Sequence, residues 1–312
     1  MQILNLLAPV FLLIALGAVM QRTGFVSAGF LREANRVTYW VGLPALLFSQ
    51  LVTSLHAVHG AEDLLAVFFL ATGLVTGLAY LAARLLRVPG AAAGTFVQGA
   101  FRGNLAFVGL PILYAMPDAP LAGGITLHTA AVLVVAPAMV LYNVVAVVAL
   151  VVSQHAFGPR MVGPVLRQLA LTPPLLATLA GVAFAAAGGT LPAAVAQALG
   201  ALGEMALPLG LLGVGGSLVT VQLRDRWQRP LASALLKGVA SPLCGWLVAR
   251  WFRLGGFETM LILVFMATPT AVISYAMAVE LRGDETLASG TIALSVLTSL
   301  LSLAAILSLA PV

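Results

Sequence analysis

The amino-acid sequence predicts an all-α integral membrane protein with ten transmembrane helices, arranged as two inverted five-helix repeats whose fourth helices are broken. Three observations predict this class: a very apolar composition, ten apolar segments separated by short loops, and basic residues gathered in alternate loops. Hydrophobic residues make up 61% of the chain and charged residues only 8%. Because a soluble domain carries about 25% charged residues, we expect most side chains to face lipid or other helices.

The ten apolar segments have the length that membrane helices need, since one bilayer crossing takes about 20 apolar residues. The first segment lacks a basic region before it and runs directly into Gln21 and Arg22, so we expect a retained span rather than a cleaved signal peptide. The fifth is longer than one straight crossing requires, which favours a tilted helix. The segments cover residues 4–21, 37–55, 63–83, 93–115, 123–152, 170–188, 197–220, 231–250, 259–280 and 287–310.

The fifteen basic residues predict the orientation of these segments. Eleven lie in the loops that follow segments one, three, five, seven and nine, whereas only Arg250 and Arg253 lie in the other loops. Because cytoplasmic loops collect Lys and Arg, we expect both termini outside the cytoplasm, in a multi-pass protein of the cell inner (cytoplasmic) membrane. The basic residues form no run of like charges, so we expect membrane lipid and no nucleic acid among the partners.

The chain divides into two halves of similar outline. Residues 1–152 form the first five-helix repeat, residues 153–169 a short cytoplasmic connecting loop, and residues 170–312 the second five-helix repeat. An odd number of spans in each half gives the two halves opposite orientations in the membrane. This inverted-repeat plan is typical of many secondary transporters.

The fourth segment of each half is the one most interrupted by helix-breaking residues. These segments contain the sequences GAFRGNLAFVGLPILYAMP and LILVFMATPTAVISYAMAVE. Pro111 and Pro269 each remove a backbone donor and clash with the preceding turn of a regular helix, and Gly103 makes departure from helical geometry easier. Paired broken helices indicate a substrate site, and the helix N-termini within them favour an anion. The alternative is that the prolines only shape helix packing.

Several stretches carry a resemblance to a known family through their order and spacing. They are PVFLLIALGAVMQRTGF, GLPALLFSQL, GNLAFVGLPIL, LTPPLLATLAGVAF and PTAVISYAMAVELRGDETLASGTIALSVLTSLLSLAAIL. Together they resemble the auxin efflux carrier family of membrane transport proteins, and its bacterial malate-permease-like members in particular. The resemblance implies that segments four and nine cross at their prolines, that substrates are organic carboxylates, and that a homodimer combines scaffold domains with mobile transport domains.

Two departures from plant members of that family bear on the substrate. Gly103 precedes Asn104 where plant members carry a proline, and the central loop is short where theirs is often long. We therefore do not expect auxin itself to be the physiological substrate, or regulation to act through the loop.

Polar residues around the two breaks are the candidate substrate-binding residues. Asn104 offers donors and an acceptor without a permanent charge in the membrane. Arg102 either holds a carboxylate through its fork of donors or extends to the cytoplasmic face as a snorkelling side chain. The full candidate set is Asn104, Arg102, Gly103, Pro111, Asn143, Pro269, Thr270 and Ser274.

Four further ionisable residues lie in or beside apolar segments. Lys237 lies close to the predicted cytoplasmic loop, so we expect it to snorkel. Glu204 and Glu280 are candidates for ion or proton coupling, although an interfacial position is the favoured account of both. His128, in the fifth segment, is expected to be a satisfied polar group.

Motifs for enzyme chemistry are not evident. The chain has neither a P-loop nor a dinucleotide fingerprint. His56 and His59, followed by Glu62 and Asp63, have metal-like spacing, but no further cluster completes a ligand set, so we expect neither a metal nor a cofactor and no enzyme activity. The sequence favours a secondary carrier that moves a small organic anion, such as a mono- or dicarboxylate or an auxin-like acid, by alternating access. The alternatives are an anion or small-solute channel, and a membrane receptor or intramembrane enzyme.

Overall fold

The computed structural model is all-helical over the residues that it describes, which are 2–54, 61–154, 173–220 and 227–309. Within these ranges no β-sheet forms, and extended backbone makes only two isolated bridges. The predicted all-α membrane class agrees with five helical stretches that are long and apolar enough to cross a bilayer. They cover Glu62–Leu85, Leu127–Gln154, Ala193–Gly213, Gln228–Trp251 and Glu285–Ser308.

The first half begins with α1 (Gln2–Arg22), followed by a continuous helical stretch made of α2 (Ala28–Val37), the π-helical turn η1 (Thr38–Gly42) and α3 (Leu43–Ser54). This stretch starts nine residues before the predicted segment 37–55. The earlier start has a local cause, because the Ser27 hydroxyl caps the helix by accepting a 3.0 Å hydrogen bond from Phe30 N.

The remaining helices follow the predicted segments in order, with two of those segments split into two separate helical parts. The helices of the first half are α4 (Glu62–Leu85), α5 (Gly90–Phe101), η3 (Leu105–Gly109), α6 (Leu110–Tyr114), η4 (Ala122–Gly124) and α7 (Leu127–Gln154). Those of the second half are α9 (Pro173–Ala186), α10 (Ala193–Thr220), α11 (Gln228–Leu235), η6 (Leu236–Ala240), α12 (Ser241–Trp251), α13 (Gly256–Ala267), α14 (Ile273–Glu280) and α15 (Glu285–Ser308).

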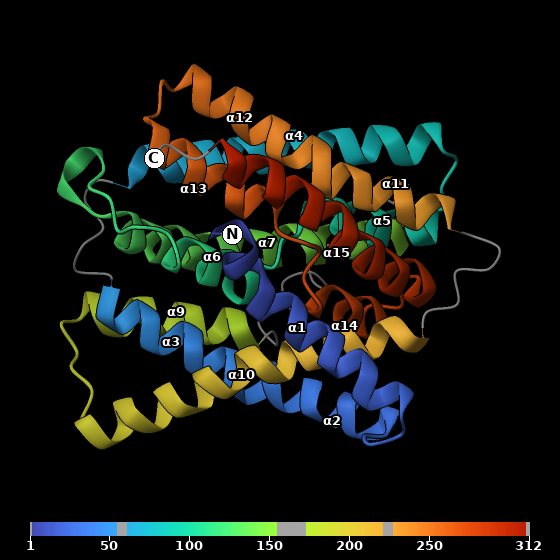
Figure 1. Cartoon of the computed structure of the whole chain (residues 1–312), viewed down its shortest axis with the longest axis horizontal. Coiled ribbons are helices and arrows are strands. Elements are labelled where there is room, and N and C mark those ends of the chain that lie inside the picture. The colour runs from blue at the N-terminus through green and yellow to red at the C-terminus, as the bar shows by residue number, and fades with distance from the viewer. Residues whose placement is uncertain (1, 55–60, 155–172, 221–226, 310–312) are drawn as a thin grey trace.

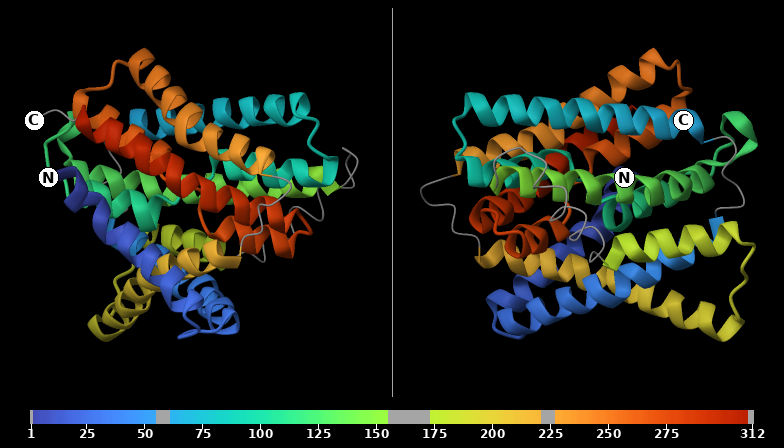
Figure 2. Two further views of the ribbon diagram at one scale, coloured as in Figure 1. Left: turned by 45° about the vertical axis from the view of Figure 1, so that its right-hand side comes forward. Right: turned by 180° about the vertical axis from the view of Figure 1, so that it is seen from behind.

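The helices gather in two layers (Figure 1). The first layer holds α1, α2, α3, α9 and α10, where α1 packs on α10 and α3 packs on α9 and α10. The second layer holds α4–α7 and α11–α15, and both groups can be followed in two further views (Figure 2). Each layer therefore combines helices from both halves of the chain.

Small residues bring α1 and α10 together in the first layer. A Cβ atom on Gly17 would lie 2.1 Å from the carbonyl oxygen of Leu212, and one on Gly215 would lie 1.8 Å from the carbonyl oxygen of Ile14. Only glycine permits such close backbone approach, which is a common way for membrane helices to associate.

The second layer has an aromatic core. The Tyr142 ring lies 5.5 Å from the Phe68 ring and 5.6 Å from the Phe101 ring, and Phe68 also contacts Phe265 edge to face. These side chains are almost wholly buried. Because they come from α4, α5, α7 and α13, they fix the ends of two interrupted helices against their neighbours.

Candidate functional site

Two interrupted helices meet in the second layer. The helix α5 ends at Phe101 and helical structure resumes at Leu105, while α13 ends at Ala267 and α14 starts at Ile273. The intervening segments, 102–104 and 268–272, pair as a short antiparallel bridge between Gly103 and Thr270. Below, "the crossover" means these two segments.

The first break lies at residues 102–104 rather than at Pro111. A π-helical turn precedes Pro111, in which Gly109 N donates to the carbonyl oxygen of Asn104 at 3.2 Å. This wider turn accommodates the proline within a helical segment. The expectation that Pro111 marks the break is therefore corrected, whereas Pro269 lies within the second break as expected.

Gly103 lies in close contact with its neighbours at the crossover. A Cβ atom at this position would lie 2.4 Å from Thr268 Oγ1 and 3.2 Å from both Cε and Nζ of Lys237. No side chain fits there without displacing its neighbours, which is the physical reason for a glycine between Arg102 and Asn104.

A small cavity of about 40 Å³ lies against the crossover. Arg102 and Asn104 line it and are 3% and 5% exposed. Its walls come from α3, the crossover, η3, α7 and the first residue of α14. The lining residues are Leu43, Arg102, Gly103, Asn104, Leu105, Ala106, Phe107, Met139, Tyr142, Ala271, Val272 and Ile273.

Arg102 is buried and does not snorkel to the membrane surface. Its guanidinium donates to Asn143 Oδ1 and, at 2.8 Å, to the sulfur of Met277. Within the described part of the chain no carboxylate contacts it. Burial of Arg102 argues against the snorkelling alternative, and its contact with a substrate carboxylate stays a prediction.

In the side-chain amide of Asn104, the oxygen is hydrogen-bonded and the nitrogen is free. Its Oδ1 accepts a 3.3 Å hydrogen bond from Phe107 N and so caps η3. Its Nδ2 donates to no group in the described ranges, and the residue lines the cavity. The amide nitrogen is therefore available to a ligand.

A larger cavity of about 660 Å³ is lined by residues of both layers and adjoins the crossover cavity, with which it shares Leu43, Phe107, Val272 and Ile273. Its lining includes two basic residues, Arg32 and Arg36. The other lining residues are Asn35, Thr38, Tyr39, Trp40, Pro173, Leu176, Gly210, Tyr275, Met277, Val279 and Leu281. The crossover thus lies beside this mostly apolar cavity, called the vestibule below, whose lining includes two arginines.

Three predicted site residues support the crossover without lining its cavity. Asn143 is 1% exposed and holds Arg102. Thr270 Oγ1 donates to the Gly99 carbonyl at 2.7 Å, so its hydroxyl is committed to holding α5 against the second break. Ser274 is 2% exposed, and its Oγ has no hydrogen-bond partner in the described ranges.

Of the two candidate coupling carboxylates, the structure describes the side chain of only one. Glu204 is exposed on α10 and lines neither cavity. Glu280 ends α14, and its side chain lies outside the described part of the structure. His56 and His59 also lie outside the described residues, and those described contain no group of three or more His, Cys, Asp or Glu that would hold a metal.

Lys237 does not snorkel, contrary to expectation. The side chain is fully buried in η6, where its Nζ donates to the carbonyl oxygen of Met266. The sequence shows a lysine inside an apolar segment but cannot show that a broken helix ends beside it. Gln98 was missed altogether, although it is fully buried and its Nε2 donates to the Ser274 carbonyl at 2.9 Å.

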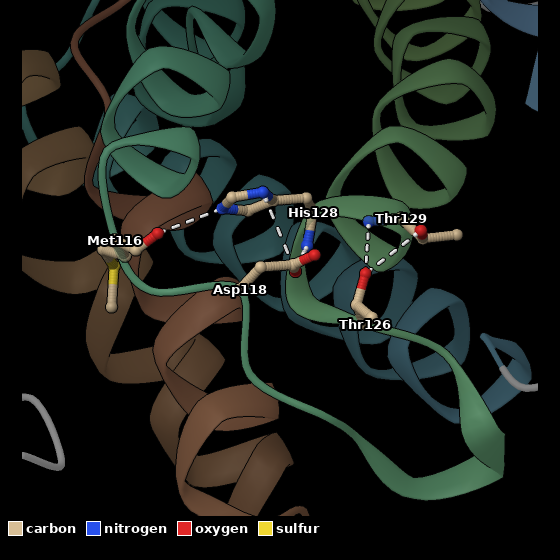
Figure 3. Close-up of polar contacts among 5 residues, drawn as sticks. All are labelled: Met116, Asp118, Thr126, His128 and Thr129. Atoms are coloured by element: carbon tan, nitrogen blue, oxygen red, sulfur yellow. Dashed lines mark hydrogen bonds and ion pairs between the residues drawn. The ribbon is translucent and has the colours of Figure 1, made fainter.

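Hydrogen bonds hold the segment between α6 and α7 in place (Figure 3). His128 Nε2 lies 3.0 Å from the carbonyl oxygen of Met116, so His128 is a satisfied polar group as expected. Asp118 accepts a 2.9 Å hydrogen bond from His128 N. This bond, together with the bond from Thr126 and the nearby imidazole, holds the pKa of the exposed Asp118 carboxyl below its usual value.

Comparison with known proteins gives one family match. A family model described as a membrane transport protein matches residues 2–307, which is nearly the whole chain. No curated protein matches the chain.

Proposed function

This chain belongs to the membrane transport protein family that includes the auxin efflux carriers, and we propose that it is a secondary carrier for a small organic anion. The observation that carries this proposal is the position of Arg102. It is a buried cation without a carboxylate partner in the described ranges, and it faces a cavity formed by two broken helices between two helical layers.

The anion preference rests on the cost of an unpaired buried charge. Removing a guanidinium from water is expensive unless an opposite charge and hydrogen bonds compensate. Neutral acceptors of Asn143 and Met277 accept hydrogen bonds from the Arg102 guanidinium but bring no negative charge. A carboxylate in the cavity would supply that charge. The free amide of Asn104 would then donate to the same carboxylate.

Alternating access is supported by the composition of the layers. The first layer combines predicted spans one, two, six and seven, and the second combines the other six, so corresponding spans of the two predicted repeats share a layer. We propose ten membrane crossings, with the second layer moving against the first to expose the crossover to either side. The vestibule beside Arg32 and Arg36 would then open toward the cytoplasm.

The proposal includes the location and assembly that the sequence suggests. The protein would lie in the cell inner membrane with both termini outside the cytoplasm, as the distribution of basic residues favours. From the resemblance to the auxin efflux carriers we also propose that the protein forms a homodimer. The substrate would be a small organic anion such as a mono- or dicarboxylate or an auxin-like acid.

Counterflow in proteoliposomes tests the proposal. Purified protein is reconstituted, and uptake of labelled mono-, di- and aromatic carboxylates is measured with the same acid inside or absent. A carrier predicts saturable uptake that internal substrate accelerates. Ion-like conductance without saturation would indicate a channel instead, and failure to move any carboxylate in the panel would overturn the assignment.

A further inference from the structure

Two arginines from opposite halves of the chain meet at one edge of the second layer. Arg87 follows the end of α4, and Arg229 lies in the first turn of α11 (Figure 1). The Arg229 guanidinium donates a 3.5 Å hydrogen bond from Nη2 to the carbonyl oxygen of Arg87. Arg84 lies one turn earlier on α4. Below, "the arginine junction" means Arg84, Arg87 and Arg229.

The positive charge of the junction is accessible and is not neutralised by a described carboxylate. Within the described ranges no ion pair involves any of its three arginines. Arg84 and Arg87 are exposed, and Arg229 is half-buried. In the sequence, residues 224–226 add two arginines and one aspartate directly before Trp227. The junction therefore offers several guanidinium donors to an anion.

Two helical stretches of membrane length end or begin at the junction. Glu62–Leu85 ends there and Gln228–Trp251 begins there, and each has 24 residues. At 1.5 Å per residue each is about 36 Å long, whereas the hydrocarbon core of a bilayer is about 30 Å thick. We therefore expect the three arginines to lie at the level of the lipid headgroups.

Exposed apolar side chains lie beside these arginines. Leu85 and Leu86, at the end of α4, are 73% and 47% exposed, and Trp227, directly before α11, is 51% exposed. Tryptophan is typical of the interface between a membrane and water. An anion with attached hydrocarbon would contact both the guanidinium groups and these apolar side chains, whereas a free inorganic anion would contact only the former.

We propose that the arginine junction binds the phosphate group of an anionic phospholipid such as phosphatidylglycerol. Planar guanidinium groups match phosphate oxygens with pairs of donors. In the orientation proposed above, the junction faces the cytoplasmic leaflet, whose anionic lipids attract basic residues near the membrane surface. A bound lipid would join α4 of one half to α11 of the other. Binding of this lipid depends on the proposed membrane orientation but not on the transported substrate.

Thermal melting of the purified full-length protein in detergent tests the proposal. Short-chain phosphatidylglycerol is titrated into the protein, and phosphatidylcholine of the same chain length and inorganic phosphate serve as comparisons. We expect a saturable rise in Tm with phosphatidylglycerol only. An equal rise with phosphatidylcholine would show binding of acyl chains alone, and an equal rise with inorganic phosphate would show a site for a free anion. Either result would overturn the proposal, whereas a failure of carboxylate uptake would not affect it.

Arg87→Gly and Arg253→Gly form a matched pair of variants. Both arginines follow the C-cap of a helix with a positive φ, 49° for Arg87 and 57° for Arg253, a conformation that favours glycine. Each substitution therefore removes one charge and relieves the same backbone strain. Arg253 follows α12, at the opposite end of the stretch Gln228–Trp251 from the junction.

Without lipid, we expect both variants to melt at or above the Tm of wild type. Only Arg87→Gly should bind phosphatidylglycerol more weakly, by about fivefold in apparent affinity, and Arg229→Gln should show a similar loss. An equal loss in Arg253→Gly would indicate a diffuse attraction of lipid to positive charge. Unchanged affinity in both Arg87→Gly and Arg229→Gln would exclude the arginine junction as the site.

Discussion

The backbone nitrogen of Asn104 donates a 2.8 Å hydrogen bond to the carbonyl oxygen of Pro269 and joins the two broken helices directly. A reciprocal bond runs from Ala271 N to the carbonyl oxygen of Arg102 at 2.9 Å. In a membrane, backbone groups freed by a helix break must find partners inside the protein. Backbone groups that one break leaves free hydrogen-bond to backbone groups of the other break. This pairing places Arg102 and Asn104 on the wall of one cavity.

Substitutions at Asn104 should separate its cap from its ligand contact. Asn104→Ala loses both, whereas Asn104→Asp keeps an oxygen that caps η3 through Phe107 N but places a negative charge in the cavity. We expect both variants to lose substrate affinity by about tenfold or more, since a hydrogen bond to a charged group contributes about 1.5–3 kcal/mol. Only Asn104→Asp should retain wild-type thermal stability.

The matched control is Leu70→Ala on α4, where the side chain is 46% exposed on the outer face. It should transport like wild type in the same proteoliposome uptake assay. Unchanged affinity in Asn104→Asp would place the substrate elsewhere.

Gly103→Ala should damage the crossover, because its Cβ would overlap Thr268 Oγ1 at 2.4 Å. Overpacking of this kind typically costs about 1–3 kcal/mol, and here it also pushes the two breaks apart. We expect a lower melting temperature and a large loss of uptake. Gly73→Ala on α4 is the matched control, since no atom lies within 4 Å of its added Cβ. It should be neutral or slightly stabilising, and equal melting curves for the two variants would refute the packing argument.

Much of this architecture could be predicted from the sequence, because bilayer crossing imposes long apolar helices that composition alone reveals. The second break was placed correctly, since Pro269 interrupts the hydrogen bonding of α13. The sequence predicts the first break at Pro111, because proline is a helix breaker. The π-helical turn of η3 accommodates this proline within a helix, and no sequence signal reveals that turn.

The candidate site was predicted in part for a similar reason. Arg102 and Asn104 stood out as polar residues in an apolar segment next to a glycine, and both line the crossover cavity. The contact between Lys237 and Met266 depends on how η6 packs against α13, and no local pattern encodes that approach. The sequence gives no signal for Gln98, because its hydrogen-bond partner, the Ser274 carbonyl, lies in the other half of the chain.

Cysteine labelling should define the topology. Thr190, in the connection between α9 and α10, and Thr286, at the start of α15, are both exposed. With the buried native Cys244 replaced by Ala, Thr190→Cys should react with a membrane-impermeant maleimide in intact spheroplasts. Thr286→Cys should react only after permeabilisation. The opposite pattern would invert the proposed orientation.

Asp118 should make a pH-dependent contribution to stability. Its pKa is lowered in the folded protein, chiefly by the hydrogen bond from His128 N, so its ionised form stabilises the fold. That contribution is full above the ordinary carboxyl pKa of about 4 and is lost as pH falls through the lowered value. Asp118→Ala should therefore melt below wild type at neutral pH, and the gap should close in acid. A gap independent of pH would exclude this role.

Substrate affinity at Arg102 tests the central claim most directly. Binding of the best transported carboxylate is measured on purified wild type, Arg102→Lys and Arg102→Ala, with folding checked by thermal melting. Arg102→Lys keeps the charge but loses the planar fork of donors, so we expect intermediate affinity, and Arg102→Ala should lose about tenfold or more. Equal affinity in all three folded proteins would contradict anion binding at the crossover.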